Sequence, residues 1–414
     1  MGWRNNHQVD LVNKQLSNIF TAKGRLEDIG AYLCPNSEPA NFVISGGSHP
    51  DERYQPLYIF FDAVIGRLPV IILHNSDIHV EAMITQSWQS IVTSPDSSPL
   101  WIVNQRNSEF EPFFGMDEMQ VVMTLRQLAY KLNYSVTPRF ERVVKAHLDI
   151  LKELNVPISL SGLNYLCKFY DMGEFHENIM ALPCGETVSR RIWADLGIDS
   201  EDSNSQFDLF RAVISNLSHD ASHSGWNDNN CVSEFNCSQA IEHNATFLLS
   251  LNDMYSEMLL PYLAEELKSI QTPFILIIDN IKVTDDHFQE YLRTTNSGCY
   301  CGIITENVVE LIGGDEDNFL RLMERINTFI ILKHSTGKTA TTISEIFGKY
   351  DYTKVETAQG TNRGFFSFLP RDRHDDVRFS TENRYRIMPE EIIGLRTGQA
   401  IIFDTSADQI IRYN

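Results

Sequence analysis

The chain has 414 residues, of which 43% are hydrophobic and 11% aromatic, and its formal net charge at pH 7 is −21. This composition is that of a globular protein with sizeable cores, and the negative charge disfavours wrapping of nucleic acid while it favours protein partners. No stretch reaches the roughly 18 consecutive apolar residues of a membrane-spanning helix, so we expect a cytoplasmic protein whose 7 cysteines are reduced thiols.

The first part of the chain alternates between strands and helices. Residues 1–39 are expected to form an N-terminal helical segment. "NFVISG" (41–46) and "LPVIILHN" (68–75) are short runs rich in β-branched residues, and the amphipathic "YQPLYIFFDAVI" separates them. "SPLWIVN" (98–104) adds a third strand. Residues 40–117 are therefore interpreted as the first part of a parallel βα sheet.

The next stretch, residues 118–243, contains one helical pattern after another. "TPRFERVVKAHLDILKEL" begins with Thr137 as a helix cap and Pro138 in the first turn, where a missing N–H costs nothing. The pattern predicts an inserted all-α domain.

Strands return in residues 244–414. They are expected within "HNATFLLSLN", "TPFILIIDN", "SGCYCGIIT", "NTFIILK" and "GQAIIFDT". The run "TPFILIIDN" is apolar throughout, as a strand buried on both faces would be. We therefore predict an α/β fold whose mainly parallel sheet is assembled from both ends of the chain and closes with a C-terminal hairpin.

One loop has the beginning of a phosphate-binding sequence. Gly46, Gly47 and Ser48 follow the first predicted strand. In the pattern G-x-x-x-x-G-K-S/T, however, the last three positions hold Asp51, Glu52 and Arg53. A carboxylate thus replaces the lysine that binds the phosphates, and Pro50 removes a backbone N–H from the loop. The loop is a nucleotide site, a degenerate one, or a strand-to-helix connection that binds nothing.

Two further stretches are similar to nucleotide-site sequences. Gly337-Lys338-Thr339 has the end of the phosphate-loop pattern, but Leu332 stands where its first glycine is required, so we expect no such loop there. The strand ending at Asp279 is typical of one that holds a magnesium-bound water. Asn280 follows it, and an amide cannot act as a general base.

The order of these stretches resembles the TraG/TraD-type coupling proteins of type IV secretion and conjugation, within the FtsK/HerA group of RecA-like P-loop NTPases. The stretches that carry the resemblance include "NFVISGGSHPDERYQPL", "FEPFFGMDEMQVV", "TPFILIIDNI", "INTFIILKHSTGKTATTISEIFGKY" and "RYRIMPEEIIGLRTGQAIIF". The similarity begins near residue 40 and covers nearly all of the chain after it. It implies a RecA-like fold with an inserted all-α domain, ATP and Mg²⁺ as ligands of an intact site, and partners in a transfer apparatus.

The resemblance also shows where this chain departs from the family. Glu52 stands at the loop-lysine position, Asn280 at the catalytic acid, and Glu306 at the sensor glutamine. These changes imply a degenerate subunit that acts through contacts with other proteins. We expect it to bind no cofactor, and its negative charge disfavours DNA as a partner. A divergent but active motor ATPase, which would use ATP and Mg²⁺, and an unrelated α/β enzyme are the alternatives.

Two clusters of histidines contain residue types that are found at functional sites. His219 and His223, with Cys231 and Cys237, include zinc-ligand types, but their spacing fits no usual zinc pattern and a polar loop explains them, so no metal is expected. The cluster of His74, Asp77 and His79 follows the second strand, where it forms a remodelled pocket, a subunit contact or a helix cap.

Arg371, Arg373 and Arg378 are expected in a loop. There they either reach a neighbouring subunit or belong to a solvated segment of mixed charge.

Overall fold

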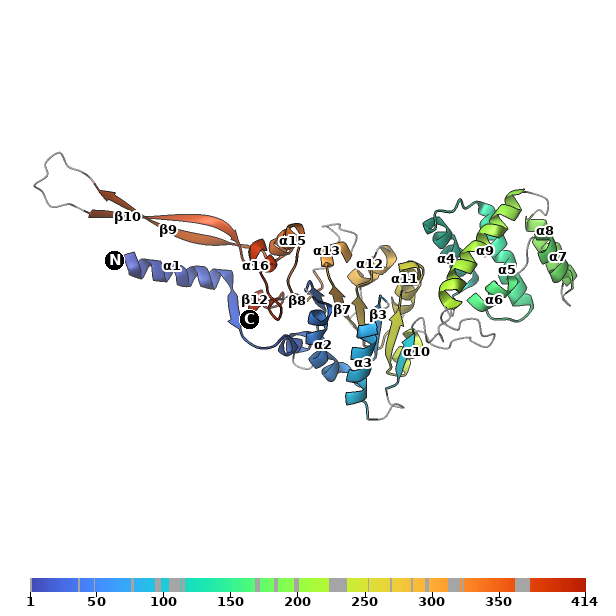
Figure 1. The fold of residues 1–414 in the computed structure, drawn as a ribbon, viewed down its shortest axis with the longest axis horizontal. Coiled ribbons are helices and arrows are strands. Elements are labelled where there is room, and N and C mark those ends of the chain that lie inside the picture. Colours follow the sequence, from blue (N-terminus) through green and yellow to red (C-terminus); the bar gives the residue numbers. More distant parts are fainter. Residues whose placement is uncertain are drawn as a thin grey trace, which may run out of the picture. The chain divides into compact units, whose positions relative to one another are not determined.

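The computed structural model describes the whole chain except residues 1, 36–37, 48, 76–77, 94–97, 104–112, 114–115, 168–171, 182–184, 197–200, 223–236, 252, 269, 284–285, 295–297, 312–320, 322–323 and 362–372. Figure 1 shows its elements in chain order.

The described strands form one ten-stranded sheet and one separate two-stranded sheet. The order in the large sheet is β1-β12-β11-β8-β2-β7-β6-β3-β5-β4. These strands are β1 (Ile19–Ala22), β2 (Phe42–Ser45), β3 (Val70–His74), β4 (Leu100–Val103), β5 (Thr246–Ser250), β6 (Phe274–Asp279), β7 (Cys299–Thr305), β8 (Thr328–Ile331), β11 (Ala400–Asp404) and β12 (Gln409–Tyr413).

The large sheet is mainly parallel, as predicted. Strands β2 and β8 pair in parallel, and so do β3 with β5 and β6, and β4 with β5. Strand β11 pairs antiparallel with both β8 and β12. Every residue of β2, β3 and β6 is buried. Strands buried on both faces consist of nearly continuous apolar runs, and such runs predicted these strands from the sequence.

The chain divides into two compact units. Unit 1 comprises Met1–Phe60, Ile303–Glu310 and Gly314–Asn414, and unit 2 comprises Phe61–Gly302 and Leu311–Gly313. Four described helices lie entirely in unit 1: α1 (Gly2–Ser17), the 3-10 helix η1 (Leu26–Leu33), α15 (Gly337–Phe347) and α16 (Pro389–Ile393). Two more helices, α2 (Pro50–Val64) and α13 (Val308–Leu311), cross the division between the units.

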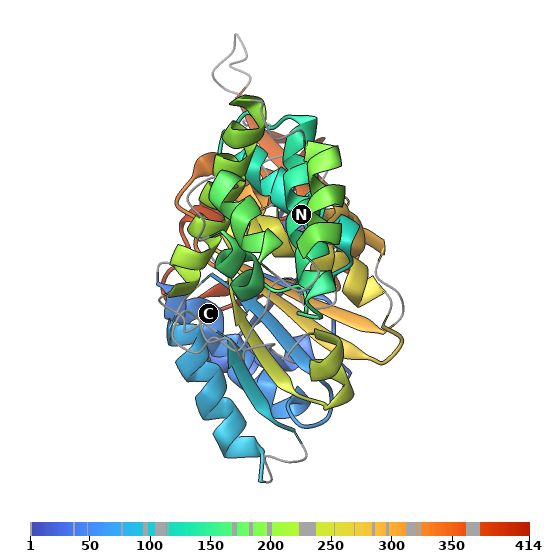
Figure 2. The same cartoon turned by 90° about the vertical axis from the view of Figure 1, so that its right-hand side faces the viewer.

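The helices of unit 2 include every described element between residues 118 and 242. They are α3 (Ile78–Ile91), α4 (Glu118–Lys131), α5 (Pro138–Glu153), α6 (Leu160–Leu166), α7 (Met172–Met180), α8 (Gly185–Leu196), α9 (Glu201–Ser222), α10 (Cys237–Glu242), α11 (Asp253–Lys268) and α12 (Asp286–Thr294). The green helices of this stretch pack against one another in Figure 2. Thr137 caps α5 by accepting the N–H of Arg139 at 3.3 Å, as the sequence predicts. That residues 118–243 fold separately stays a prediction.

A long β-hairpin in unit 1 was not foreseen. Strand β9 (Lys349–Thr361) pairs antiparallel with β10 (Arg373–Tyr385) over 13 residue pairs, and α1 runs alongside them in Figure 1. The prediction that Arg373 and Arg378 lie in a loop was wrong, because both belong to β10. Arg371 lies outside the described residues. A second difference is β1, which lies in the segment expected to be helical and pairs with β12.

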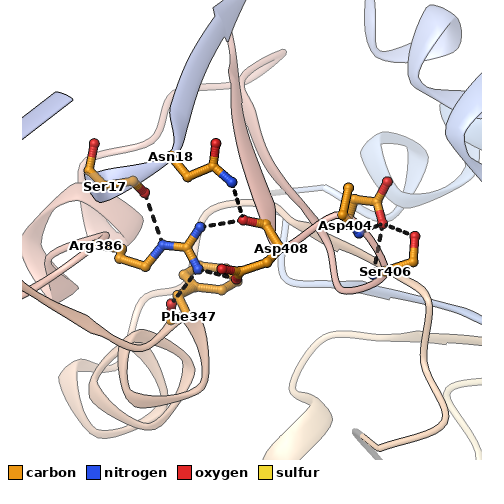
Figure 3. Close-up of polar contacts among 8 residues, drawn as sticks. Ser17, Asn18, Phe347, Arg386, Asp404, Ser406 and Asp408 are labelled. Atoms are coloured by element: carbon orange, nitrogen blue, oxygen red, sulfur yellow. Dashed lines mark hydrogen bonds and ion pairs between the residues drawn. The ribbon is translucent and has the colours of Figure 1, made fainter. Parts of the chain in front are cut away.

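Arg386 directly follows β10 and holds the base of this hairpin, which we call its root, through the contacts drawn in Figure 3. Its guanidinium donates to the carbonyl oxygens of Ser17 (3.0 Å), Phe347 (3.4 Å) and Asp408 (2.7 Å), and it forms an ion pair with the Asp408 carboxylate. The ring of Phe403 lies under the cation, 5.7 Å away. One buried side chain therefore joins the ends of α1 and α15 to the turn between β11 and β12.

Candidate functional site

The loop after β2 needs its two glycines for backbone reasons alone. Gly46 and Gly47 have φ angles of +96° and +102°, which residues with a Cβ rarely adopt. A Cβ on Gly46 would lie 2.8 Å from the carbonyl oxygen of Lys333 and 2.9 Å from that of Leu332. The loop therefore passes too close to the end of β8 for any larger residue.

The N–H groups of both glycines are used inside the protein. Gly46 donates to the carbonyl oxygen of Thr305 at 3.0 Å, and Gly47 donates to that of Lys333 at 2.9 Å. These bonds hold the loop between the last residue of β7 and the segment that follows β8. Neither N–H is then available to a phosphate without breaking a hydrogen bond of the fold.

The side chain of Glu52 folds back over the start of α2. Glu52 is only 5% exposed, and its Oε2 accepts the backbone N–H of His49 at 3.4 Å. The same oxygen lies 3.4 Å from where a Cβ on Gly47 would be. A carboxylate near the amino end of a helix is favoured by the N–H groups there, so the chain supplies its own anion where a phosphate loop would hold one. Ser48 lies outside the described residues.

Arg53 closes the loop from the helix side. Its side chain is 2% exposed and donates to the carbonyl oxygen of Gly46 at 3.1 Å and to Glu306 Oε1 at 3.1 Å. The Glu306 side chain is 73% exposed, so solvent screens the ion pair and the bond to the Gly46 carbonyl contributes more to holding the loop. The sequence had assigned Arg53 and Glu306 to separate motifs, and no local pattern indicated that they meet.

A buried histidine completes the loop's surroundings. His334 Nε2 lies 3.3 Å from Ser45 Oγ, and the same hydroxyl oxygen accepts the N–H of Val308 at 3.2 Å. Burial lowers the pKa of His334 to about 4, although a hydrogen bond with the Ser45 backbone opposes the shift. His334 is therefore neutral at pH 7 and adds no positive charge to the loop.

In unit 2, two ionisable residues lie at the carboxyl ends of neighbouring strands. Asp279 at the end of β6 is 1% exposed, and His74 at the end of β3 is fully buried and pairs with it in register. His74 Nε2 lies 3.7 Å from Glu81 Oε1 on α3, so the His74 ring faces a helix of its own unit. Asn280 has a φ of +50°, a conformation that asparagine tolerates better than glutamate does.

The other predicted sites are not assembled in the described part of the chain. Asp77, His223 and Cys231 lie outside it, as does the side chain of His219, and Cys237 is buried in α10, where burial raises the pKa of its thiol well above the usual value. The described residues hold no group of three potential metal ligands. Gly337 begins α15, so Gly337-Lys338-Thr339 forms the first turn of a helix. Among the helices that the structure describes, none is long and apolar enough to cross a membrane.

Comparison with known proteins identifies the fold. No protein-family profile matches the chain, and no curated sequence does. Among solved structures, the bacterial conjugative coupling protein TrwBdeltaN70 in an unbound monoclinic form matches with a TM-score of 0.61 at 10% identity, over 91% of this chain and 86% of that one.

Two other forms of the same coupling protein also match. TrwBdeltaN70 in a trigonal form with sulphate has a TM-score of 0.59 at 11% identity, over 95% and 92% of the two chains. TrwB in complex with ADP and Mg²⁺ has a TM-score of 0.58 at 11% identity, over 92% and 86%. The mainly parallel sheet and these matches show that the chain has the RecA-like P-loop fold of a conjugative coupling protein, as the resemblance of its motifs implied.

Proposed function

We propose that this chain is a coupling-protein-like subunit of a DNA- or protein-transfer apparatus, with a nucleotide site that no longer binds or hydrolyses ATP. It works in the cytoplasm through contacts with proteins of the apparatus, among them an active coupling ATPase. The fold supports this role, because solved structures with the same fold are conjugative coupling proteins.

The observation that carries the proposal is that groups of the chain itself make the hydrogen bonds that the loop could otherwise offer to a phosphate. The Glu52 carboxylate accepts the His49 N–H, and the N–H groups of Gly46 and Gly47 donate to carbonyl oxygens. A solved structure of TrwB, which has the same fold, contains ADP and Mg²⁺, whereas in this chain Glu52 stands at the lysine position and the N–H groups of both glycines already donate to carbonyl oxygens of the chain. Two unit charges of the same sign about 4 Å apart repel by about 4 kcal/mol in a partly buried site, so a phosphate at such a distance from Glu52 would bind roughly 1000-fold more weakly.

The strand-end residues of unit 2 support the same conclusion independently. Asp279 is retained, but Asn280 cannot accept a proton from an attacking water. Residual binding would therefore be hydrolytically silent, and no cofactor is required.

The test is calorimetry with Mg-ATP together with a phosphate-release assay on the full chain. We expect no heat of binding at micromolar concentration and no release above that of buffer. The Glu52→Gln variant is the matched control, because it removes the charge and keeps an acceptor for the His49 N–H. Micromolar binding by the unaltered chain that Asp279→Ala abolishes would instead establish the divergent motor ATPase.

A further inference from the structure

One edge of the hairpin of β9 and β10 is covered by α1, and no described strand pairs with the other edge. On β9, the Asn13 side chain of α1 donates to the Thr353 carbonyl oxygen and accepts its N–H, both at 2.9 Å. The carboxamide thus makes the two hydrogen bonds that the peptide of a neighbouring strand would make.

This contact fixes which backbone groups of β10 point outward. Thr353 directs its N–H and carbonyl away from β10, so its pair with Thr381 is a non-hydrogen-bonded pair of the hairpin ladder. The two pair types alternate along the ladder, so the pair of Gly348 and Arg386, five positions away, should be hydrogen-bonded. The N–H of Arg386 does donate to the Gly348 carbonyl, at 3.0 Å. Phe379, Thr381 and Asn383 therefore present their backbone groups on the outer edge of β10.

The side chains along this edge are exposed. Every residue from 378 to 384 is exposed, and Phe379 has 59% of its surface in contact with solvent. Phe379 also lines an open groove of about 270 Å³ together with Gln8, Val9, Val12 and Thr353. A long strand edge with an exposed phenylalanine is a surface on which another strand can pair.

The sequence of β10 is complementary to itself when reversed about Ser380. In an antiparallel pair centred there, Arg378 of one copy lies opposite Glu382 of the other, and symmetry repeats this pair. Phe379 lies opposite Thr381, so the outward backbone groups of both strands meet in hydrogen-bonding positions. The same centre sets position 376, an aspartate in the sequence, opposite position 384, an arginine. A shift of the centre to Phe379 would set position 376 opposite Glu382 instead, which like charges oppose.

Charge also distinguishes the hairpin from the rest of the chain. Its two strands contain five Lys and Arg residues and five Asp and Glu residues, in a chain with a net charge of −21. Two copies can therefore bring these strands together without the repulsion that opposes contact elsewhere.

We propose that two copies of this chain pair through the outer edge of β10, antiparallel and centred on Ser380, to give a four-stranded sheet β9-β10-β10-β9. The contact is small, so the dimer is weak and forms at the concentrations of an assembly. The pairing uses neither the loop after β2 nor a nucleotide, and it goes beyond the proposed function.

Cysteine cross-linking tests both the contact and its register. Ser380 faces its own symmetry mate in a non-hydrogen-bonded pair, where Cα atoms lie about 4.5 Å apart, within disulfide range. Thr381 faces Phe379 of the other copy, and its own mate lies beyond about 7 Å. Oxidation of Ser380→Cys with diamide should therefore give a disulfide-linked dimer at least 10-fold more abundantly than oxidation of Thr381→Cys or of the unaltered chain. Equal cross-linking at both positions, or none at either, would overturn the proposal.

Charge reversal gives a second, independent readout. In a dimer of Glu382→Arg, arginine faces arginine at both symmetry-related pairs of positions 378 and 382. In a dimer of Arg378→Glu, glutamate faces glutamate at the same two pairs. Each variant alone should therefore self-associate at least 10-fold more weakly by sedimentation equilibrium. A mixture of the two variants restores both ion pairs and should recover dimers. Undiminished self-association of either variant, or a mixture that stays monomeric although both variants keep the circular dichroism of the unaltered chain, would contradict the pairing.

Discussion

Replacing Arg386 by methionine should detach the root of the hairpin from the body of unit 1. Methionine keeps an apolar stem against Phe403 but cannot donate to the Ser17, Phe347 and Asp408 carbonyl oxygens. The side chain is 8% exposed, so water replaces these donors poorly.

The magnitude follows from the bonds that are lost. A hydrogen bond from a charged donor contributes about 1.5 to 3 kcal/mol, and the 3.4 Å bond to Phe347 contributes least. The ion pair adds at most about 1 kcal/mol, because the Asp408 side chain is 73% exposed. We expect a loss of roughly 3 to 5 kcal/mol of local stability once partial resolvation of the carbonyls is allowed for.

Amide hydrogen exchange is the suitable assay, because it reports the opening of one region of a large protein. A loss of 3 kcal/mol corresponds to exchange that is roughly 100-fold faster in α1, β9 and β12. Arg396→Met is the matched control, since Arg396 is an exposed arginine of the same unit outside the hairpin. If both variants exchanged at the same rate as the unaltered chain, the cluster in Figure 3 would not hold the hairpin.

Three further outcomes are expected around the loop after β2. Gly46→Ala should destabilise the fold by more than about 2 kcal/mol in chemical denaturation, because its φ is +96° and its Cβ would meet the Lys333 carbonyl. His334 has a pKa lowered to about 4, so its neutral form stabilises the fold above pH 6.5 and this contribution is lost as the pH falls towards 4. The unfolding free energy of His334→Gln should therefore fall by about 2 kcal/mol less between pH 7 and pH 5 than that of the unaltered chain. Glu52→Lys should bind no Mg-ATP in calorimetry and should melt at a lower temperature, because it buries an ammonium at the amino end of a helix, where the adjacent residue Arg53 is already a buried cation.

The central strands could be predicted from the sequence because burial on both faces leaves a simple signal. Each residue of Phe274–Asp279 is buried, and the sequence there is apolar up to its last position. Thr137 and Pro138 likewise marked the start of α5, since caps act through local geometry.

The hairpin lacked such a signal for a physical reason. Residues 349–355 of β9 and 378–385 of β10, whose burial the structure describes, are exposed or half-buried, and polar and charged residues occur on both faces of the strands, so no apolar alternation marks them. Arg373 and Arg378 were accordingly interpreted as loop residues. Strand β1 was missed because four residues pair only with β12, nearly 400 residues away in the sequence, and tertiary contact alone decides their conformation.

The candidate site was predicted at the level of residue types but not of contacts. The replacement of lysine by Glu52 could be recognised from spacing. That the carboxylate turns back to the His49 N–H, and that Arg53 reaches the Gly46 carbonyl and Glu306, depends on how α2 meets the segments after β2 and β7. No periodicity or motif carries that information.

The two glycines of the loop after β2 are required by the fold itself. Gly46 must pass within 3 Å of the backbone that follows β8, and both glycines have positive φ angles, so the fold itself requires them whether or not a phosphate is bound. The lysine position carries no such constraint, because its side chain is needed for the ligand alone. If the chain binds no nucleotide, as proposed, that position can hold a carboxylate that accepts an N–H at the amino end of α2. A glycine pair after a buried strand therefore indicates close packing of backbones, and only the cation that follows distinguishes a nucleotide site.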